Sequence, residues 1–247
     1  MRRTPLVAAV FAALLLLTGC TAASEDGAAR YDCNGRAVER TAFEARVPLA
    51  DLDEGGRDAL TEALQAEGFG RTVSSDDGWF VLTRSATSIE VMREITESSD
   101  ASDGEIPPDH EFLAIEKAAA PGGEPAWTVW SSSSCALRVD LGQLEVPGIA
   151  FPEAPDPGAT ELRLLVRESA CASGQDAEGR IQLVALEESD DRITVTLGVR
   201  PLDAEAVSCP GNPDTPFTVS LSAPLGDREV VDAGLVVPRP VAVQPDR

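Results

Sequence analysis

Four cysteines limit how this chain can fold, because each disulfide they form joins distant parts of the sequence. They are Cys33, Cys135, Cys171 and Cys209. An even number of cysteines in an exported chain predicts two disulfides, and four cysteines allow three pairings. A proline-rich stretch separates the first two from the last two, so we favour Cys33–Cys135 and Cys171–Cys209. The sequence alone leaves the other two pairings open.

The first residues predict export. Arg2 and Arg3 precede Leu6–Leu17, an uninterrupted apolar run of 12 residues. A helix that spans a bilayer needs about 20 residues. A basic start with a shorter apolar run is therefore typical of a signal peptide rather than a membrane-spanning anchor. We predict a signal peptide at residues 1–19, and disulfide-permissive surroundings for the chain that follows.

The end of the apolar run carries a resemblance to a known class of proteins. Leu17-Thr18-Gly19-Cys20 is similar to the lipobox of bacterial lipoproteins. This resemblance implies cleavage between Gly19 and Cys20, a diacylglycerol on the Cys20 thiol, palmitate among its acyl chains, and a place on the outer face of the cytoplasmic membrane. Two acyl chains anchor a protein stably, whereas one does so only marginally. An ordinary secretory signal, cut near residues 21–24, is the alternative.

Charge excludes some partners. The chain has 42 acidic and 20 basic residues, a net charge of −22. Removal of residues 1–19 takes away two arginines and leaves −24. A nucleic-acid-binding protein shows a basic patch, so we expect no nucleic-acid partner. Anionic lipids repel an acidic body, so attachment to the membrane depends on Cys20. Residues 20–30 are small and polar and predict a flexible tether of about 17–20 Å.

Patterning predicts two domains of the α+β class, predominantly β. Residues 31–145 form an α+β domain, with one helix at Asp53–Glu67 because its alanines and leucines fall on one stripe. Asp51 or Asp53 caps this helix and Gly68 ends it. Strands are expected at 79–84, 88–95, 111–117 and 126–130.

The rest of the chain predicts a small antiparallel β domain linked by the second disulfide. Residues 146–159 contain four prolines without periodicity and are interpreted as an extended linker. In the β domain, 160–243, apolar residues alternate with polar ones at 191–200 and 217–223, which predicts strands with one side in solvent. Weaker alternation predicts strands at 160–168 and 180–188.

Residues 160–234 resemble the C-terminal part of uncharacterised exported proteins and lipoproteins of high-GC Gram-positive bacteria. The shared features are a Cys-Ala-Ser-Gly turn, a Cys-Pro-Gly-Asn-Pro loop and a Leu-Gly-Asp-Arg turn. The resemblance implies a disulfide-linked β module outside the membrane and brings no activity with it.

No strong catalytic or metal signature is present. His110 is the single histidine, and its functional interpretation is a general base with Ser131–Ser134 as a nucleophile source. We favour a surface position for it at the start of a strand, because no serine-hydrolase motif accompanies it. Asp100, Asp103 and Glu105 lack the spacing of an EF-hand, and we expect a polar loop there rather than a calcium site. The absence of CxxC spacing argues against zinc, and no cofactor motif is found.

Trp127 and Trp130 are three residues apart on a predicted strand. That odd spacing directs them to opposite faces, so one is expected in the core and the other exposed. An exposed tryptophan could stack on a sugar or contact a protein partner.

These observations favour a lipid-anchored extracytoplasmic protein that binds a partner or structures the envelope. The alternative is a cell-envelope hydrolase with its site between the domains and His110 as a candidate residue of that site; the sequence does not decide whether the protein is an enzyme. A transporter's substrate-binding subunit ranks last, because the long alternating β/α pattern is missing.

Overall fold

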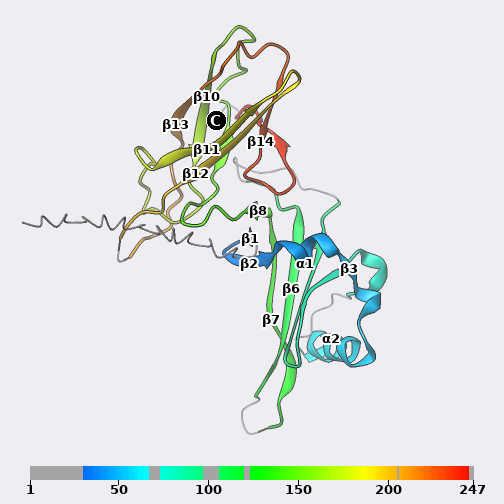
Figure 1. Cartoon of the computed structure of the whole chain (residues 1–247). Helices are drawn as coiled ribbons and strands as arrows, with labels where there is room; N and C mark the ends of the chain where they lie inside the picture. The colour runs from blue at the N-terminus through cyan, green and yellow to red at the C-terminus, as the bar shows by residue number, and fades with distance from the viewer. Residues whose placement is uncertain (1–29, 67–72, 97–105, 120–122, 205, 245–247) are drawn as a thin grey trace, which may run out of the picture.

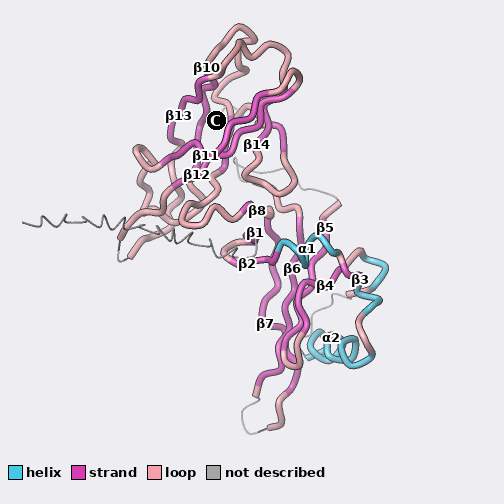
Figure 2. Tube along the Cα trace, in the orientation of Figure 1, coloured by secondary structure: helices cyan, strands magenta, loops and turns pink. Residues whose placement is uncertain are grey.

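Over the residues that it describes, the computed structural model is mostly β, as the sequence predicted, and has two α-helices, of which the sequence predicted one (Figures 1 and 2). The structure describes residues 30–66, 73–96, 106–119, 123–204 and 206–244. The signal, Cys20, the tether, Gly68 and the predicted loop with Asp100, Asp103 and Glu105 lie outside these ranges. Within them, no helix is long and apolar enough to cross a membrane.

The elements follow one another in two groups. The helices are α1 (Arg40–Ala45), α2 (Glu54–Ala66) and the short 3-10 turns η1 (Leu49–Asp51) and η2 (Ser75–Asp77). The strands are β1 (Arg30–Cys33), β2 (Arg36–Glu39), β3 (Val47–Pro48), β4 (Phe80–Arg84), β5 (Ser88–Glu94), β6 (His110–Ala118), β7 (Ala126–Cys135), β8 (Arg138–Val139), β9 (Gly148–Ala150), β10 (Glu161–Arg167), β11 (Ile181–Glu188), β12 (Arg192–Val199), β13 (Thr215–Ser220), β14 (Glu229–Asp232) and β15 (Arg239–Pro240).

The N-terminal body is built on a five-stranded antiparallel sheet with the order β3-β4-β5-β6-β7. Helix α2 covers one face, where Leu60 and Ala63 pack with Val91 and Ile115 in one buried cluster. The helix begins where predicted because Asp53 Oδ1 accepts a hydrogen bond from the Gly56 N–H at 2.8 Å. Its observed range confirms the predicted helix to within one residue at each end.

The opposite face of this sheet packs against α1 and the β1–β2 hairpin. Phe43 of α1 lies in a buried cluster with Phe80 and Phe112 of the sheet. The disulfide Cys33–Cys135 joins β1 to the end of β7. It is the first of the two pairs that the sequence favoured, and it holds the hairpin against the sheet.

The C-terminal body consists of two sheets that face each other. One has the order β13-β10-β9 and the other β11-β12-β14-β15. Alternate residues of β10 and β12, such as Leu164 and Val195, fill the core between them. All pairs are antiparallel except β12 with β14. The disulfide Cys171–Cys209 joins the loop after β10 to the one before β13.

Two expectations for this region need correction. The stretch 146–159 is not a free linker, because β9 pairs with β10 and Phe151 lies in the core. The predicted solvent side of 191–200 is also covered near its end. Leu144 packs so closely over Gly198 that a Cβ there would lie 2.9 Å from the Cβ of Leu144. The proline-rich segment 146–159 is therefore part of the C-terminal body and packs on its sheet.

The two bodies meet in a joint made by chain segments 137–146 and 232–239. Strand β8 pairs with β1 of the N-terminal body, and Arg138 also bridges to Leu235. The Val139 N–H donates to the Gly234 carbonyl at 2.9 Å, and the Val236 N–H donates to the Leu137 carbonyl at 2.9 Å. Figure 1 shows β8 at the junction of the two bodies.

The close approach at Gly234 yields the first prediction. A Cβ at this position would lie 2.5 Å from Cγ1 of Val146, a buried side chain with little room to move. Gly234→Ala is therefore expected to lower the free energy of unfolding by about 1–3 kcal/mol, measured by urea denaturation of the disulfide-bonded protein.

Gly55→Ala is the matched control. Gly55 is exposed in α2, and its new Cβ would meet only Asp53 Oδ1 at 3.7 Å. Alanine is a better helix former, so this variant is expected to gain up to about 1 kcal/mol. Equal unfolding free energies for Gly234→Ala and the wild type would contradict the proposed close packing of the joint.

Candidate functional site

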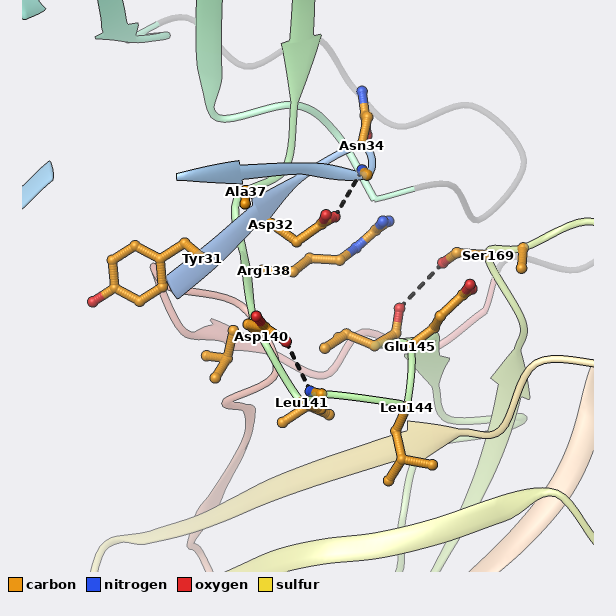
Figure 3. A pocket seen from close by; sticks show the side chains of 15 residues that line it. Tyr31, Asp32, Asn34, Ala37, Arg138, Asp140, Leu141, Leu144, Glu145 and Ser169 are labelled. Carbon is orange, nitrogen blue, oxygen red and sulfur yellow. Dashed lines mark hydrogen bonds between the residues drawn. The ribbon is translucent and has the colours of Figure 1, made fainter. Parts of the chain in front are cut away.

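Two neighbouring hollows of the described surface lie at the joint. One has a volume of about 560 Å³ and a neighbouring one about 510 Å³. Both are lined by Asn34, Arg138, Ser169 and Ala170, so we treat them as one junction cleft. Figure 3 shows the first hollow, with residues from β1, the β1–β2 turn, β8 and the segment after β8 around it.

Two tight turns place carboxylates on the wall of the cleft. Asp32 Oδ1 accepts the Gly35 N–H at 3.1 Å, and Asp140 Oδ1 accepts the Gly142 N–H at 2.7 Å (Figure 3). The first turn uses Asn34 and Gly35, both with positive φ, the pair that a tight hairpin favours. Each bond fixes its carboxylate at the edge of the hollow.

Arg138 borders both hollows of the cleft and brings a positive charge to each. Among the described residues its guanidinium forms no ion pair, and its buried Nε has no hydrogen-bond partner. A buried donor without an acceptor costs about 1–3 kcal/mol. Strand β8 nevertheless holds Arg138 here, between the carboxylates of Asp32 and Glu145 in the view of Figure 3. Arg138 is therefore a donor without an acceptor on a cleft wall.

Glu145 is a carboxylate of the cleft whose surroundings change its pKa. Burial and the nearby negative charge of Glu168 raise its pKa, against the opposing effects of an Ala170 backbone hydrogen bond and Arg138. The Glu145 backbone is fixed to β12, because its N–H and carbonyl both bond Val199, at 2.9 and 2.8 Å. Glu145 is therefore protonated more readily than an ordinary glutamate, and its backbone is held in place.

The structure corrects the predicted surface position of His110. This side chain is completely buried at the first position of β6 and stacks edge-on with Phe43. Its Nδ1 lies 2.6 Å from Asp109 Oδ1, and its Nε2 has no hydrogen-bond partner among the described residues. No hydrogen bond therefore joins Nε2 to Ser131–Ser134 of β7. Among the described residues, His110 and the serines at 131–134 therefore do not form the base–nucleophile pair that the hydrolase hypothesis needs.

Asp109 connects His110 to the joint. Asp109 Oδ1 accepts the Leu137 N–H at 2.9 Å, and Oδ2 accepts Nη2 of Arg239 at 2.9 Å. Arg239 also donates through Nη1 to the Pro107 carbonyl at 2.9 Å. Burial acts to raise the pKa of Asp109, but the hydrogen bonds with His110 and with the Leu137 N–H, together with the charge of Arg239, hold it below its ordinary value. An ionised Asp109 thus joins β6 to β15 of the other body.

The two tryptophans lie as their spacing predicted. Trp127 packs against the cluster under α2, and Trp130 is 59% exposed. The register of β6 with β7 shifts between Val129 and Ser131, so Trp130 falls at a β-bulge. Arg36 stacks on its ring at 4.8 Å and on Phe112 at 4.6 Å. Trp130 therefore lies outside the junction cleft.

Sequence reasoning missed the residues that shape the cleft, namely Asp32, Arg138, Asp140 and Glu145. The Asp-x-x-Gly and Asp-x-Gly spacings at 32–35 and 140–142 were the available signal, since they are typical of turns closed by a carboxylate. Nothing in the sequence indicated that the two turns would meet. Over the described ranges, no three His, Cys, Asp or Glu side chains are placed to hold a metal ion.

Asp232 is a further buried carboxyl at the joint. It is 7% exposed, and its Oδ1 accepts the Gly234 N–H at 2.8 Å. Burial raises its pKa to about 6, although the Gly234 hydrogen bond and the charges of Arg138 and Arg239 oppose the increase. The charged form of Asp232 is therefore disfavoured in the folded state.

This raised pKa predicts how stability depends on pH. Between the ordinary value of 3.8 and about 6, the folded state binds more protons at Asp232 than the unfolded state does. Stability therefore falls as the pH rises through this window, by about 3 kcal/mol in total. Asp232→Asn can still accept the Gly234 N–H but cannot ionise. The difference in unfolding free energy, variant minus wild type, is therefore expected to become more positive by up to about 3 kcal/mol as the pH rises from 4 to 7.5. Urea denaturation at each pH measures it.

Asp156→Asn is the control for this prediction, because Asp156 accepts the Gly158 N–H at 2.8 Å in an exposed turn of the same kind. If the difference in unfolding free energy between Asp232→Asn and wild type stays constant with pH, the raised pKa of Asp232 is contradicted.

The comparisons with known proteins add no further constraint. The chain matches no family model, no curated protein and no solved structure. The resemblance of residues 160–234 to exported proteins of high-GC Gram-positive bacteria stays a prediction. The junction cleft is accordingly the candidate functional site on the strength of its own geometry.

Proposed function

We propose that this protein is a lipid-anchored extracytoplasmic binding protein, whose junction cleft takes an uncharged, hydroxyl-rich ligand such as a carbohydrate of the cell envelope. The predicted signal and lipobox support the location, and the cleft supports the binding role. The observation that carries the proposal is Arg138, a guanidinium with a buried, unbonded Nε on the wall of a cleft between two bodies.

Hydrogen-bonding capacity favours hydroxyl groups as the ligand's polar groups. Asp32, Asp140 and Glu145 offer acceptors on the first hollow, and Arg138 offers donors. A hydroxyl group both donates and accepts, so one ring with several hydroxyls can satisfy both kinds of partner. Carboxylates and guanidinium groups also form the stronger, charge-assisted hydrogen bonds.

Charge and shape support the same ligand class. The first hollow has three carboxylates and one guanidinium on its wall, which disfavours an anion. Leu141, Leu144 and Tyr31 add apolar surface to the same hollow. A sugar ring presents hydroxyls at its edge and C–H groups on its faces, and polar groups on an otherwise apolar wall suit such a molecule.

The alternative is a hydrolase that acts on a ligand in the same cleft. Glu145 favours it, because a carboxyl with a raised pKa can act as a general acid. Glycoside hydrolysis needs a second carboxylate, and Asp32 is on the wall of the same hollow. This alternative depends on Glu145, since the buried His110 takes no part in the cleft.

The anchor is tested at Cys20. Cys20→Ala is expected to abolish incorporation of a palmitate analogue and to move the protein from the membrane fraction to the medium or to an unprocessed form. Immunoblots of cell fractions and metabolic labelling measure both results. Ser24→Ala, in the predicted tether, is the control. Unchanged membrane association of Cys20→Ala would refute the anchor.

The ligand class is tested by NMR titration of the soluble body, lacking the signal, with cellobiose, maltose and N,N′-diacetylchitobiose. At least one is expected to shift the amide signals of Gly35, Gly142 and Ser169. Arg138→Gln is expected to weaken that binding by at least about tenfold, because a charge-assisted hydrogen bond is lost. Arg163→Gln removes an exposed arginine of β10 and is the matched control.

Two results would overturn the binding proposal. One is that no sugar shifts the cleft signals, and the other is that Arg138→Gln binds as tightly as Arg163→Gln does. Cleavage of a probe sugar during the titration, lost in Glu145→Gln, would instead establish the hydrolase.

A further inference from the structure

A smaller cavity of about 250 Å³ lies beside the joint, lined by β9, β15 and the residues just before β6. We name it the Asp232 pocket. Its apolar lining includes Ile149, Leu165, Leu235 and Val241, and its polar lining includes Asp232. We propose that this pocket binds a small apolar molecule with one ammonium group, which pairs with the carboxylate of Asp232.

The other charged groups of the pocket already have partners. Arg167 bonds Asp214 through Nε at 2.8 Å and Nη2 at 2.9 Å, and Gln244 Nε2 also donates to Asp214 at 2.9 Å. Arg239 is held by Asp109 and the Pro107 carbonyl. Asp232 forms no ion pair within the described residues, and its hydrogen bond there comes from the Gly234 backbone.

A buried carboxylate without an ion pair is costly, so a cation in contact with it is stabilised. Arg138 and Arg239 lie beyond contact distance of Asp232, and their charges only partly offset the effect of burial. Burial therefore still raises the pKa of Asp232 to about 6. The group is therefore ionised at pH 7.5 without a contact partner. A ligand ammonium would supply that contact.

The local charge balance also favours a cation. Asp109, Asp214 and Asp232 contribute three negative charges to the pocket and its immediate partners, and Arg167 and Arg239 contribute two positive ones. One negative charge is left over. The four paired groups, Asp109 with Arg239 and Asp214 with Arg167, neutralise each other, so the excess is centred on Asp232.

The volume sets the size of the ligand. A cavity of 250 Å³ corresponds to the liquid volume of roughly eight water molecules, at about 30 Å³ each. It suits a compact molecule of roughly nine non-hydrogen atoms. Phenethylamine has this size, an apolar ring and one primary amine that is protonated at neutral pH.

The Asp232 pocket is distinct from the junction cleft in its chemistry. Ile106, Gly148 and Arg167 border both the pocket and the second hollow of the cleft, but the apolar side chains of Ile149, Leu165 and Val241 line the pocket and not that hollow. Because Pro107 belongs to the N-terminal body, an occupant would contact both bodies at the joint. The inference does not rest on the proposed carbohydrate site.

Phenethylamine and its uncharged counterpart, 2-phenylethanol, test the proposal at pH 7.5. The soluble body is titrated with each, and binding is followed through the methyl signals of Ile149, Leu165 and Val241. The wild type is expected to bind the amine at least about tenfold more tightly than the alcohol. This comparison needs no variant, so it is decisive even where a substitution fails to fold.

Asp232→Asn removes the negative charge but keeps the turn, because the amide oxygen can still accept the hydrogen bond from the Gly234 N–H. The variant is expected to bind amine and alcohol equally, whereas Asp156→Asn, with the same change in an exposed turn, keeps the preference. Equal affinity of the wild type for the two probes, binding of neither, or an amine preference that survives Asp232→Asn would overturn the proposal.

Discussion

The carboxylate of Asp109 holds the two bodies of this protein in one arrangement. It accepts hydrogen bonds from the Leu137 backbone and from Arg239, a residue 130 positions later in the chain, and its other neighbour is the buried ring of His110. A buried carboxylate needs several partners to remain charged. Leu137 and Arg239 come from two other segments, so the charge is fully satisfied only when these segments meet at the joint. The junction cleft lies at the same joint.

Close packing makes this electrostatic connection rigid. The segment between β8 and β9 lies between two glycines, with Leu144 over Gly198 and Val146 over Gly234. Neither glycine can gain a Cβ without displacing its neighbour, so the segment has little freedom to slide. Glu145, which lies between those two side chains, is therefore fixed on the cleft wall. Rigid support of this kind is what a binding site requires.

Local patterns predicted the parts of the fold that depend on local physics. The stripe of Leu60 and Ala63 predicted α2, and the alternation at 191–200 predicted β12, because a buried face dictates its own period. The joint has no such period. It uses β8, a strand of two residues, and the side chain of Asp109, which contacts the buried His110 and the distant Arg239. Long-range pairings of this size leave no periodic signal, so the cleft residues could not be identified beforehand.

Arg138 links the two proposed sites electrostatically. Its charge lowers the pKa of Glu145 in the cleft and also that of Asp232 at the neighbouring pocket, while burial raises both. The proposed ligands of the cleft and of the pocket would therefore both lie within the field of one guanidinium.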